Sequence, residues 1–496
     1  MKDEPAASEL RRGRLPGDVY LRRRRPRTVG LFRVLGVSGL YSAAYGNVGS
    51  SIYYALGVTA FYALGLTPVV FIISGFFFLC TALSYVEGTA AMPEAGGSMA
   101  FARRGFNTTV SFLAGWAQIL NYVVTIAISA FAVPAYLSVF VPELGTWPTN
   151  ALVGALVVGV LAGINIVGVQ ESSRVNVLLA LLDLSTQFLI VLMGLWLLLS
   201  PDILLDNIHF GEAPTLSQFL LGISISMIAY TGIETVSNLS EETRNPGKNV
   251  PRAVLLTFGT VLIMYTLIPI VALSALPVEA QADGTYVTQL GEEFIEDPVL
   301  GIVKQFEDLP GLLQGTLEAW VGLLAATILI IATNAGMLGL SRLAYSMGRY
   351  QQLPPAISRL HPVRRTPVVA IAVFGLVAAL LVLPGKVQQL ASLYAFGAML
   401  SFTFAHMSII ALRAKEPDMA RPFRIGLNVR VRGRAIPLPS VIGALATGGT
   451  WVVVVVTEEV TRYVGFAWLA VGLAMFLLYQ RSRQRGVVVE QSVREG

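Results

Sequence analysis

The chain has little charge and almost no cysteine. Asp, Glu, Lys and Arg make up 13% of its 496 residues, and Cys80 is its one cysteine. A single cysteine excludes a disulfide framework within the chain. The three histidines, His209, His361 and His406, are too far apart in the sequence to suggest a metal site. We therefore expect neither a metal nor a cofactor.

Catalytic signatures are missing too. The sequence contains no P-loop, no HExxH and no G-x-S-x-G motif, so we predict that the chain is not an enzyme. The first 30 residues are polar and basic, which excludes a cleavable signal peptide. Because an apolar segment follows directly, we interpret this basic stretch as a cytoplasmic segment beside the membrane and expect no nucleic-acid partner.

Apolar residues are abundant instead. They make up 54% of the chain, well above globular usage, which indicates a polytopic membrane protein. A membrane-spanning helix needs about 20 apolar residues. The twelve candidate spans are residues 31–56, 67–91, 109–140, 149–167, 175–199, 216–239, 253–276, 319–345, 367–383, 390–412, 438–456 and 464–479.

The distribution of positive charge predicts the orientation. Cytoplasmic loops are enriched in Lys and Arg. With a cytoplasmic N-terminus, all but three of the 35 Lys and Arg residues fall on the inner side of the twelve spans; the exceptions are Lys304, Lys386 and Arg462. We therefore expect both termini in the cytoplasm, a cell-membrane location and contact with membrane lipid.

Two of these spans contain residues that interrupt helices. Glycines and serines cluster in the first span, and Gly232 stands near the middle of the sixth. Small residues in the first span alone would also suit close helix packing, but matching interruptions in two halves point to the binding site of an inverted-repeat transporter. Free amides at a half-helix N-terminus attract a carboxylate, and freed carbonyls accept from an ammonium group. An α-amino acid has both ends.

The residues that we predict to bind substrate come from both interruptions. They are Gly46, Gly49, Ser50, Ser51, Ile52, Ala229, Tyr230, Thr231 and Gly232. We expect the amides of the first interruption to bind a carboxylate and the carbonyls of the second to bind an amine. The Tyr230 ring is expected to cover the substrate as a gate.

Three motifs occur in order at the ends of spans 2, 6 and 8. They are Pro93-Glu94-Ala95-Gly96-Gly97-Ser98; Tyr230, Gly232, Glu234, Glu241-Glu242, Asn245-Pro246 and Pro251-Arg252; and Ser341-Arg342, Met347, Arg349 and Leu353-Pro354. Together they resemble the signature of the amino acid–polyamine–organocation (APC) superfamily. The resemblance implies an all-α fold of the LeuT type, with spans 1–5 and 6–10 as inverted repeats and two additional helices.

The chain departs from the family pattern in two places. The family's span-1 motif usually reads Gly-Ser-Gly-Ile-Phe, whereas this chain has Ser51 at the position of the second glycine. The serine side chain narrows the space for the ligand backbone or adds a hydroxyl to it. Ile233 stands where an aromatic residue is common. Both departures leave the identity of the substrate open.

Three carboxylates lie inside predicted spans, where charge is costly: Asp183, Glu234, and Glu87 near the inner end of span 2. Asp183 lies about 12 Å from the inner end of span 5, at about 1.5 Å per residue. Relatives that resemble this span hold a lysine there, whose amine takes the place of a sodium ion. Asp183 can bind Na⁺, carry a proton, or be a simple hydrogen-bonded aspartate. Of these roles we favour the proton carrier. We expect the Asp183 side chain to face spans 1 and 8. Glu234 is expected to hold span 6 in its interrupted form without contacting substrate.

These observations predict a secondary active transporter that moves an amino acid or a related amine, coupled to H⁺ or Na⁺ through Asp183. A K⁺ transporter of the same fold and an exchanger without ion coupling are the alternatives. A receptor would need an output domain, and the tails are short. The predicted parts are a basic tail (1–30), a ten-helix core (31–412), a basic cytoplasmic loop (413–436), spans 11 and 12 (437–480) and a C-terminal tail (481–496).

Overall fold

The computed structural model describes residues 33, 35–168, 173–209, 211–431 and 433–495. The predicted basic tail, residues 1–30, lies outside the described residues. Within the described residues, ten helical segments are long and apolar enough to cross a membrane. The protein is therefore a mostly helical, polytopic membrane protein.

The first half of the chain is almost entirely helical. Its elements are α1 (Val37–Val48), η1 (Gly49–Ser51), α2 (Ile52–Ala63), η2 (Leu64–Leu66), α3 (Thr67–Ala91), α4 (Ser98–Gly105), α5 (Thr108–Leu137), η3 (Pro142–Gly145), α6 (Thr149–Val167), α7 (Ser173–Leu197), α8 (Pro201–Asp206), α9 (Leu216–Ala229), α10 (Glu234–Asn238) and η4 (Ser240–Glu242). The predicted sixth span thus corresponds to two helices, α9 and α10.

The second half adds two small antiparallel hairpins to its helices. Its elements are α11 (Pro246–Ala275), β1 (Val278–Ala280), β2 (Tyr286–Thr288), η5 (Gln289–Gly291), α12 (Pro298–Lys304), α13 (Gly311–Arg349), α14 (Pro355–Ser358), α15 (Val368–Val382), α16 (Val387–Lys415), β3 (Asn428–Val431), β4 (Arg434–Pro437), α17 (Leu438–Thr457) and α18 (Glu459–Glu495). The sequence pattern did not predict either hairpin.

Several helices differ in length from the predicted spans. Helix α13 has 39 residues, or about 58 Å, so it extends well beyond an apolar layer of about 30 Å. Helix α15 has only 15 residues, and α18 continues through the stretch that we predicted as a C-terminal tail. The ends of a helix depend on capping and packing, and a hydropathy pattern predicts neither of these.

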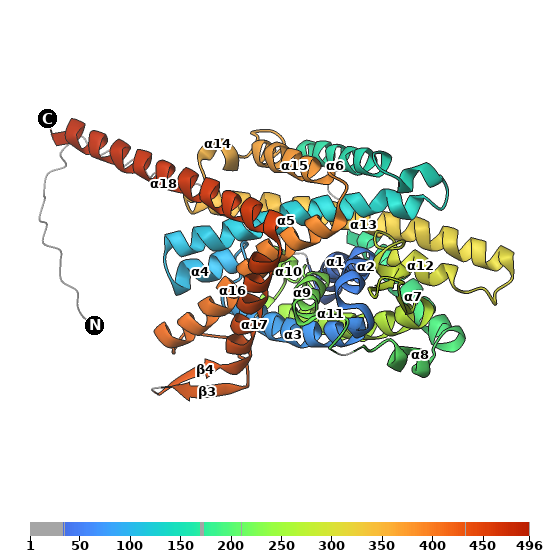
Figure 1. Cartoon of the computed structure of the whole chain (residues 1–496). Helices are drawn as coiled ribbons and strands as arrows, with labels where there is room; N and C mark the ends of the chain where they lie inside the picture. The colour runs from blue at the N-terminus through green and yellow to red at the C-terminus, as the bar shows by residue number, and fades with distance from the viewer. Residues whose placement is uncertain (1–32, 34, 169–172, 210, 432, 496) are drawn as a thin grey trace, which may run out of the picture. The chain divides into compact units, whose positions relative to one another are not determined.

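Helix α5 lies at the centre of the described bundle. Its most apolar 18-residue window is 100% buried, and α5 packs against α13, α16, α6 and α4. Figure 1 shows α5 and α13 side by side. Gly339 permits this approach, because a Cβ there would lie 2.6 Å from Cε1 of Tyr122. Small residues at such contacts let membrane helices pack closely.

Candidate functional site

The interruption in the first span is a tight helical turn. Residues Gly49–Ser51 form a 3₁₀ helix between α1 and α2, and the Gly49 N–H still donates to the Tyr45 carbonyl. The α-helix is thus interrupted at the predicted position, but the interruption is a single wound 3₁₀ turn whose backbone stays hydrogen-bonded. Nothing in the local sequence forces unwinding, because glycine and serine also adopt the right-handed helical region observed at Gly49.

The sixth span is truly interrupted. Helix α9 ends at Ala229, residues 230–233 form a turn, and α10 begins at Glu234. Gly232 has φ of +118°, a conformation that favours glycine because it has no Cβ. The predicted interruption at Gly232 is therefore present.

The two interruptions lie against each other. Asn47, at the end of α1, donates from Nδ2 to Oγ1 of Thr235 in α10 at 2.9 Å. A Cβ at Gly232 would lie 3.0 Å from both Asn47 Nδ2 and Val48 Cγ2. Gly232 therefore allows the turn of span 6 and also its close approach to span 1.

Glu234 is buried beside this contact, with 1% of its surface exposed. Its Oε2 accepts from the Gly232 N–H at 3.0 Å, and its Oε1 accepts from Asn121 Nδ2 at 2.9 Å. The carboxylate thus ties the span-6 turn to the central helix α5. Asn121 had no assigned role in the sequence analysis, since one asparagine in an apolar span carries no signal of its own.

Asp183 is fully buried in α7 and has three hydrogen-bond donors. Tyr53 Oη donates to Oδ1 at 2.7 Å, Tyr45 Oη donates to Oδ2 at 3.0 Å, and Gln187 Nε2 donates to Oδ2 at 2.9 Å. Gln187 Nε2 also donates to the Gly49 carbonyl at 3.3 Å. Asp183 is therefore connected to both halves of span 1 and to the turn between them, and α7 also packs against α13.

Sequence reasoning could have found one of these three donors. Gln187 follows Asp183 by four residues, and side chains at this spacing share a helix face. Tyr45 and Tyr53 belong to another span, so only the packing of α7 against α1 and α2 brings them to the carboxylate.

Hydroxyl groups surround the two turns. Ser50 Oγ donates to the Asn47 carbonyl at 3.1 Å, and Ser51 Oγ is hydrogen-bonded to Tyr54 Oη at 2.8 Å. Thr231 Oγ1 bonds to the Ile228 carbonyl at 2.7 Å and to the Tyr394 hydroxyl. The predicted residues Ser50, Ser51 and Thr231 thus lie in one polar layer.

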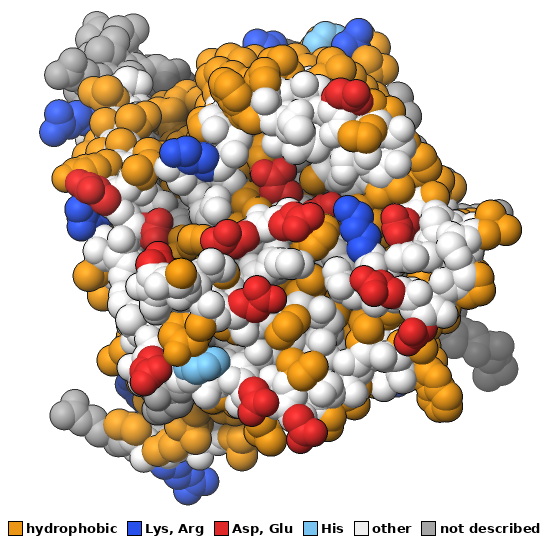
Figure 2. Space-filling view, turned by 45° about the vertical axis from the view of Figure 1, so that its right-hand side comes forward, with side chains coloured by type: hydrophobic (Ala, Val, Ile, Leu, Met, Phe, Trp, Pro, Cys, Tyr) orange, Lys and Arg blue, Asp and Glu red, His pale blue; other side chains and the backbone are white. Residues whose placement is uncertain are grey.

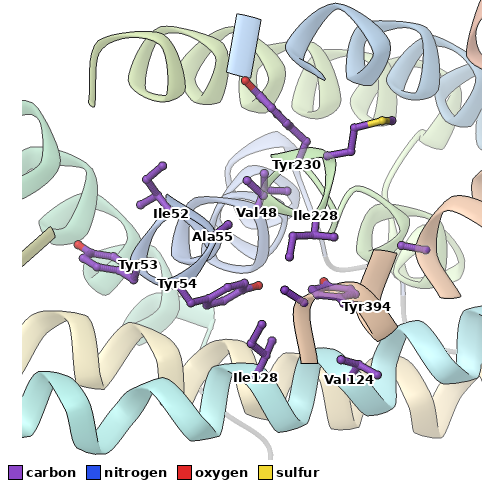
Figure 3. Close-up of a cluster of buried hydrophobic side chains, with 14 of the residues drawn as sticks. Val48, Ile52, Tyr53, Tyr54, Ala55, Val124, Ile128, Ile228, Tyr230 and Tyr394 are labelled. Atoms are coloured by element: carbon purple, nitrogen blue, oxygen red, sulfur yellow. The ribbon is translucent and has the colours of Figure 1, made fainter. Parts of the chain in front are cut away.

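Tyr230 points away from this layer. Its hydroxyl donates to the Phe71 carbonyl at 2.8 Å, and its ring lies 5.1 Å from that of Tyr265 and 5.2 Å from that of Phe78. Figure 3 shows Tyr230 directed away from Tyr394. Its expected role as a gate stays a prediction and requires a different rotamer.

An apolar wall stands next to the hydroxyl layer. Figure 3 shows Val124 and Ile128 of α5 opposite Tyr54, Tyr394 and Ile228. All five side chains are at most 1% exposed. The centre of the bundle is therefore closed and combines hydroxyl groups with apolar surface.

The three sequence motifs meet at one end of the bundle. The Ala95 N–H donates to Glu241 Oε1 at 3.2 Å, and the Gly96 N–H donates to Asn238 Oδ1 at 3.0 Å. Arg342 of α13 pairs with Glu242 at 2.7 Å. The turn after α3, the segment after α10 and the end of α13 are thus held together.

A buried ion pair joins further elements near this end. Glu87 and Arg413 are each 2% exposed at the side chain, and the carboxylate accepts from Arg413 Nε at 2.5 Å and Nη2 at 2.6 Å. It also accepts from the Ile425 N–H at 2.9 Å. This pair joins α3 and α16 to the loop before β3.

The face that carries the loop between α11 and α13 is acidic. A hollow of about 620 Å³ there is lined by Phe61 of α2, Gln388 of α16 and residues of the loop, including Glu279, Glu292 and Glu293. Figure 2 shows Asp and Glu side chains spread over this face. Across the described residues, no group of three or more His, Cys, Asp or Glu side chains is arranged to hold a metal ion.

Comparison with known proteins shows the family of the chain. The model of the amino acid permease family matches residues 35–478. Similar proteins include the branched-chain amino acid permease BcaP of Bacillus subtilis, 25% identical over 472 residues, which cover 92% of this chain and 94% of the relative.

Two further relatives are named for other substrates. The methylthioribose transporter of Bacillus subtilis is 24% identical over 83% of this chain and 85% of its own. The low-affinity putrescine importer PlaP of Escherichia coli is 26% identical over 82% of this chain and 84% of its own. These matches confirm the resemblance drawn from the three motifs: the chain belongs to the amino acid permease family within the APC superfamily, and it is a permease, not an enzyme.

Proposed function

We propose that this permease is a secondary active transporter that moves an amino acid or a related amine by alternating access. The observation that carries the proposal is the contact between the two turns at the centre of the bundle, where Asn47 bonds to Thr235. Interrupted helices that meet in the middle of a membrane protein present backbone groups to a solute.

The proposed topology has twelve spans, both termini in the cytoplasm and the LeuT-type 5+5 arrangement. The run Val37–Ala91 has 55 residues, or about 82 Å of helix, enough for two crossings of an apolar layer of about 30 Å. Helix α15 is an apolar helix of 15 residues and supplies the ninth span. The predicted charge distribution supports this count.

The substrate would bind between the two turns. Amides near Gly49, Ser50 and Ser51 would attract its carboxylate once the 3₁₀ turn opens, because the Gly49 N–H now donates to the Tyr45 carbonyl. Carbonyls near Ala229 to Thr231 would accept from its amine. Gly46 supports this location, because it is buried and no heavy atom lies within 4 Å of a Cβ placed there. Ile52 would complete the contact on the α2 side.

The coupling ion would bind at Asp183. This buried carboxylate contacts both halves of span 1, so its charge affects the helix that binds substrate. We favour H⁺, with Na⁺ as the alternative ion. Glu234 would act as a structural support that holds the span-6 turn, because both of its oxygens already accept hydrogen bonds.

The contacts among the three motifs would form the inner gate. The ion pairs Arg342–Glu242 and Arg349–Glu241, with N···O distances of 2.7 and 3.8 Å, connect α13 to the segment after α10. Opening toward the cytoplasm would require these pairs to separate. Pairs at a partly exposed surface are weak enough for such a step.

The names of the relatives point to amino acids and amines as first candidates. Ligand-induced thermal stabilisation of the purified chain across amino acids and polyamines would identify the substrate, because a ligand of the folded state stabilises by mass action. Uptake of that compound into proteoliposomes then tests transport. A chain that takes up K⁺ but no amino acid or amine would refute the proposal, and uptake by counterflow alone would make it an exchanger.

A further inference from the structure

The hairpin of β3 and β4 lies between two helices that are long and apolar enough to cross a membrane. It follows α16, which ends at Lys415, and β4 runs directly into α17, which begins at Leu438. Helix α17 has 20 residues, or about 30 Å, which just spans the apolar layer. Figure 1 shows the hairpin at the edge of the bundle beside α17. Its strands therefore lie at the level of the lipid headgroups.

The base of the hairpin is fixed to the bundle by the buried ion pair of Glu87 and Arg413. Arg413 donates from Nη1 to Asn428 Oδ1, at the start of β3, at 3.3 Å. The Ile425 N–H, in the loop before β3, donates to the Glu87 carboxylate at 2.9 Å. The hairpin is thus held in one position before it contacts anything else, which lowers the entropic cost of binding.

One face of the hairpin is apolar and uncovered. The register pairs Val429 with Ile436 and Val431 with Arg434, and paired or alternate residues of a hairpin share a face. Val429 and Val431 are each 48% exposed, and Leu427, two residues before Val429, is 67% exposed. A two-stranded hairpin alone is marginally stable in water, so this face is suited to contact with another surface.

Unpaired positive charge accompanies the apolar face. Residues 419–437 contain five arginines and no Asp or Glu. Arg421 donates to backbone carbonyls of its own loop. Arg424, Arg430 and Arg434 are exposed, and no ion pair between described residues includes them. Apolar side chains with free guanidinium groups are complementary to a surface that carries anions above an apolar layer.

We propose that the hairpin face formed by Leu427, Val429, Val431 and Arg434 docks on the anionic phospholipid headgroups of the leaflet beside it. The apolar side chains contact the boundary between headgroups and acyl chains, and the Arg434 guanidinium binds phosphate oxygens through two parallel hydrogen bonds. Under the proposed topology this is the cytoplasmic leaflet, where Lys and Arg segments meet anionic lipid. The docking goes beyond transport and needs no substrate.

A second copy of the chain fits this face less well than lipid does. A symmetric contact brings the same patch of both copies together, so Arg434 of each copy would approach its own counterpart. Like charges across an interface are unfavourable. The anionic headgroups supply the opposite charge that the hairpin lacks.

The test is hydrogen–deuterium exchange of the hairpin amides in nanodiscs that hold one copy of the full chain. The discs contain phosphatidylcholine alone or a mixture with phosphatidylglycerol, and no substrate is added. We expect slower exchange in β3 and β4 when phosphatidylglycerol is present, and high salt should remove the difference because it screens exposed charges. In Arg434→Gln the slowing should fall about fivefold, the contribution of one arginine near an anionic surface.

Arg430→Gln is the matched control, because it removes the same charge from the opposite face of the same hairpin. It should lose clearly less of the slowing than Arg434→Gln does. Equal exchange of the wild-type hairpin in the two lipids, equal losses in the two variants, or a slowing that high salt leaves unchanged would each overturn the proposal. The wild-type comparison is decisive even for a variant that folds poorly. No readout involves a substrate, so either result leaves the proposed transport function untouched.

Discussion

Replacing Gly49 by alanine should perturb span 1 through one side chain. A Cβ at Gly49 would lie 2.7 Å from Cζ and 2.9 Å from Cε2 of Tyr45, whereas carbon atoms in contact are about 3.5–4.0 Å apart. The Tyr45 ring must therefore move by about 1 Å. Its hydroxyl, now 3.0 Å from Asp183 Oδ2, would then leave hydrogen-bond distance.

The expected loss of stability follows from three contributions. Overpacking of a buried site costs about 1–3 kcal/mol, and loss of a hydrogen bond to a charged group costs about 1.5–3 kcal/mol. Alanine recovers about 1 kcal/mol through its higher helix propensity. The net loss in the free energy of unfolding is about 1.5–5 kcal/mol, or roughly 3–10 °C in Tm at about 2 °C per kcal/mol.

Thermal unfolding of the purified protein measures this loss, and proteoliposome uptake of the identified substrate should fall with it. Gly46→Ala is the matched control for stability, because Gly46 is in the same helix and a Cβ added there would have no heavy atom within 4 Å; its Tm should stay level or rise. If the collision is the cause, Gly49→Ala should add little to the cost of Tyr45→Leu. Additive losses, or an unchanged Gly49→Ala protein, would refute the reasoning.

Three further predictions concern carboxylates. Glu234→Gln should lower Tm and turnover together, by about 1–3 kcal/mol in stability, since its amide cannot accept from both Gly232 and Asn121; a changed substrate preference at unchanged Tm would contradict this. Glu87→Ala should cost about 3–5 kcal/mol, because it leaves Arg413 buried without its partner, whereas a loss of less than about 1 kcal/mol would contradict it. Burial raises the pKa of Glu296, in the loop before α12, to about 7 from an ordinary 4.5. An acid with a raised pKa stabilises the fold at low pH and loses that contribution as pH rises through about 7. The fall in Tm between about pH 5 and about pH 8 should therefore flatten in Glu296→Gln.

Much of the architecture could be predicted from local sequence. Hydropathy alone located the apolar spans, because the cost of exposing polar backbone to lipid forces each crossing into a helix. Gly232 marked the interruption of span 6, since its φ of +118° is open to glycine and costly for other residues. The three motifs identified the superfamily, and the family match over residues 35–478 confirmed it.

The conformation of the span-1 turn could not be predicted from local sequence. Gly49, Ser50 and Ser51 permit both an unwound segment and a 3₁₀ turn, and the sequence does not select between them. Tyr45 packs across Gly49, and Gln187 of α7 bonds to the Gly49 carbonyl. The first contact is local and the second is tertiary, and both favour the 3₁₀ turn over an unwound segment.

The sequence by itself determined the class of protein, its apolar helices, the position of the span-6 turn and the presence of carboxylates inside the spans. Only the tertiary structure decided the partners of those carboxylates. Asp183 bonds to Tyr45 and Tyr53, which are 138 and 130 residues away in the chain, and Glu234 bonds to Asn121 across 113 residues. The reason is physical: hydropathy and helix propensity act over a few neighbouring residues, whereas a buried charge is satisfied by whichever donors packing brings within about 3 Å.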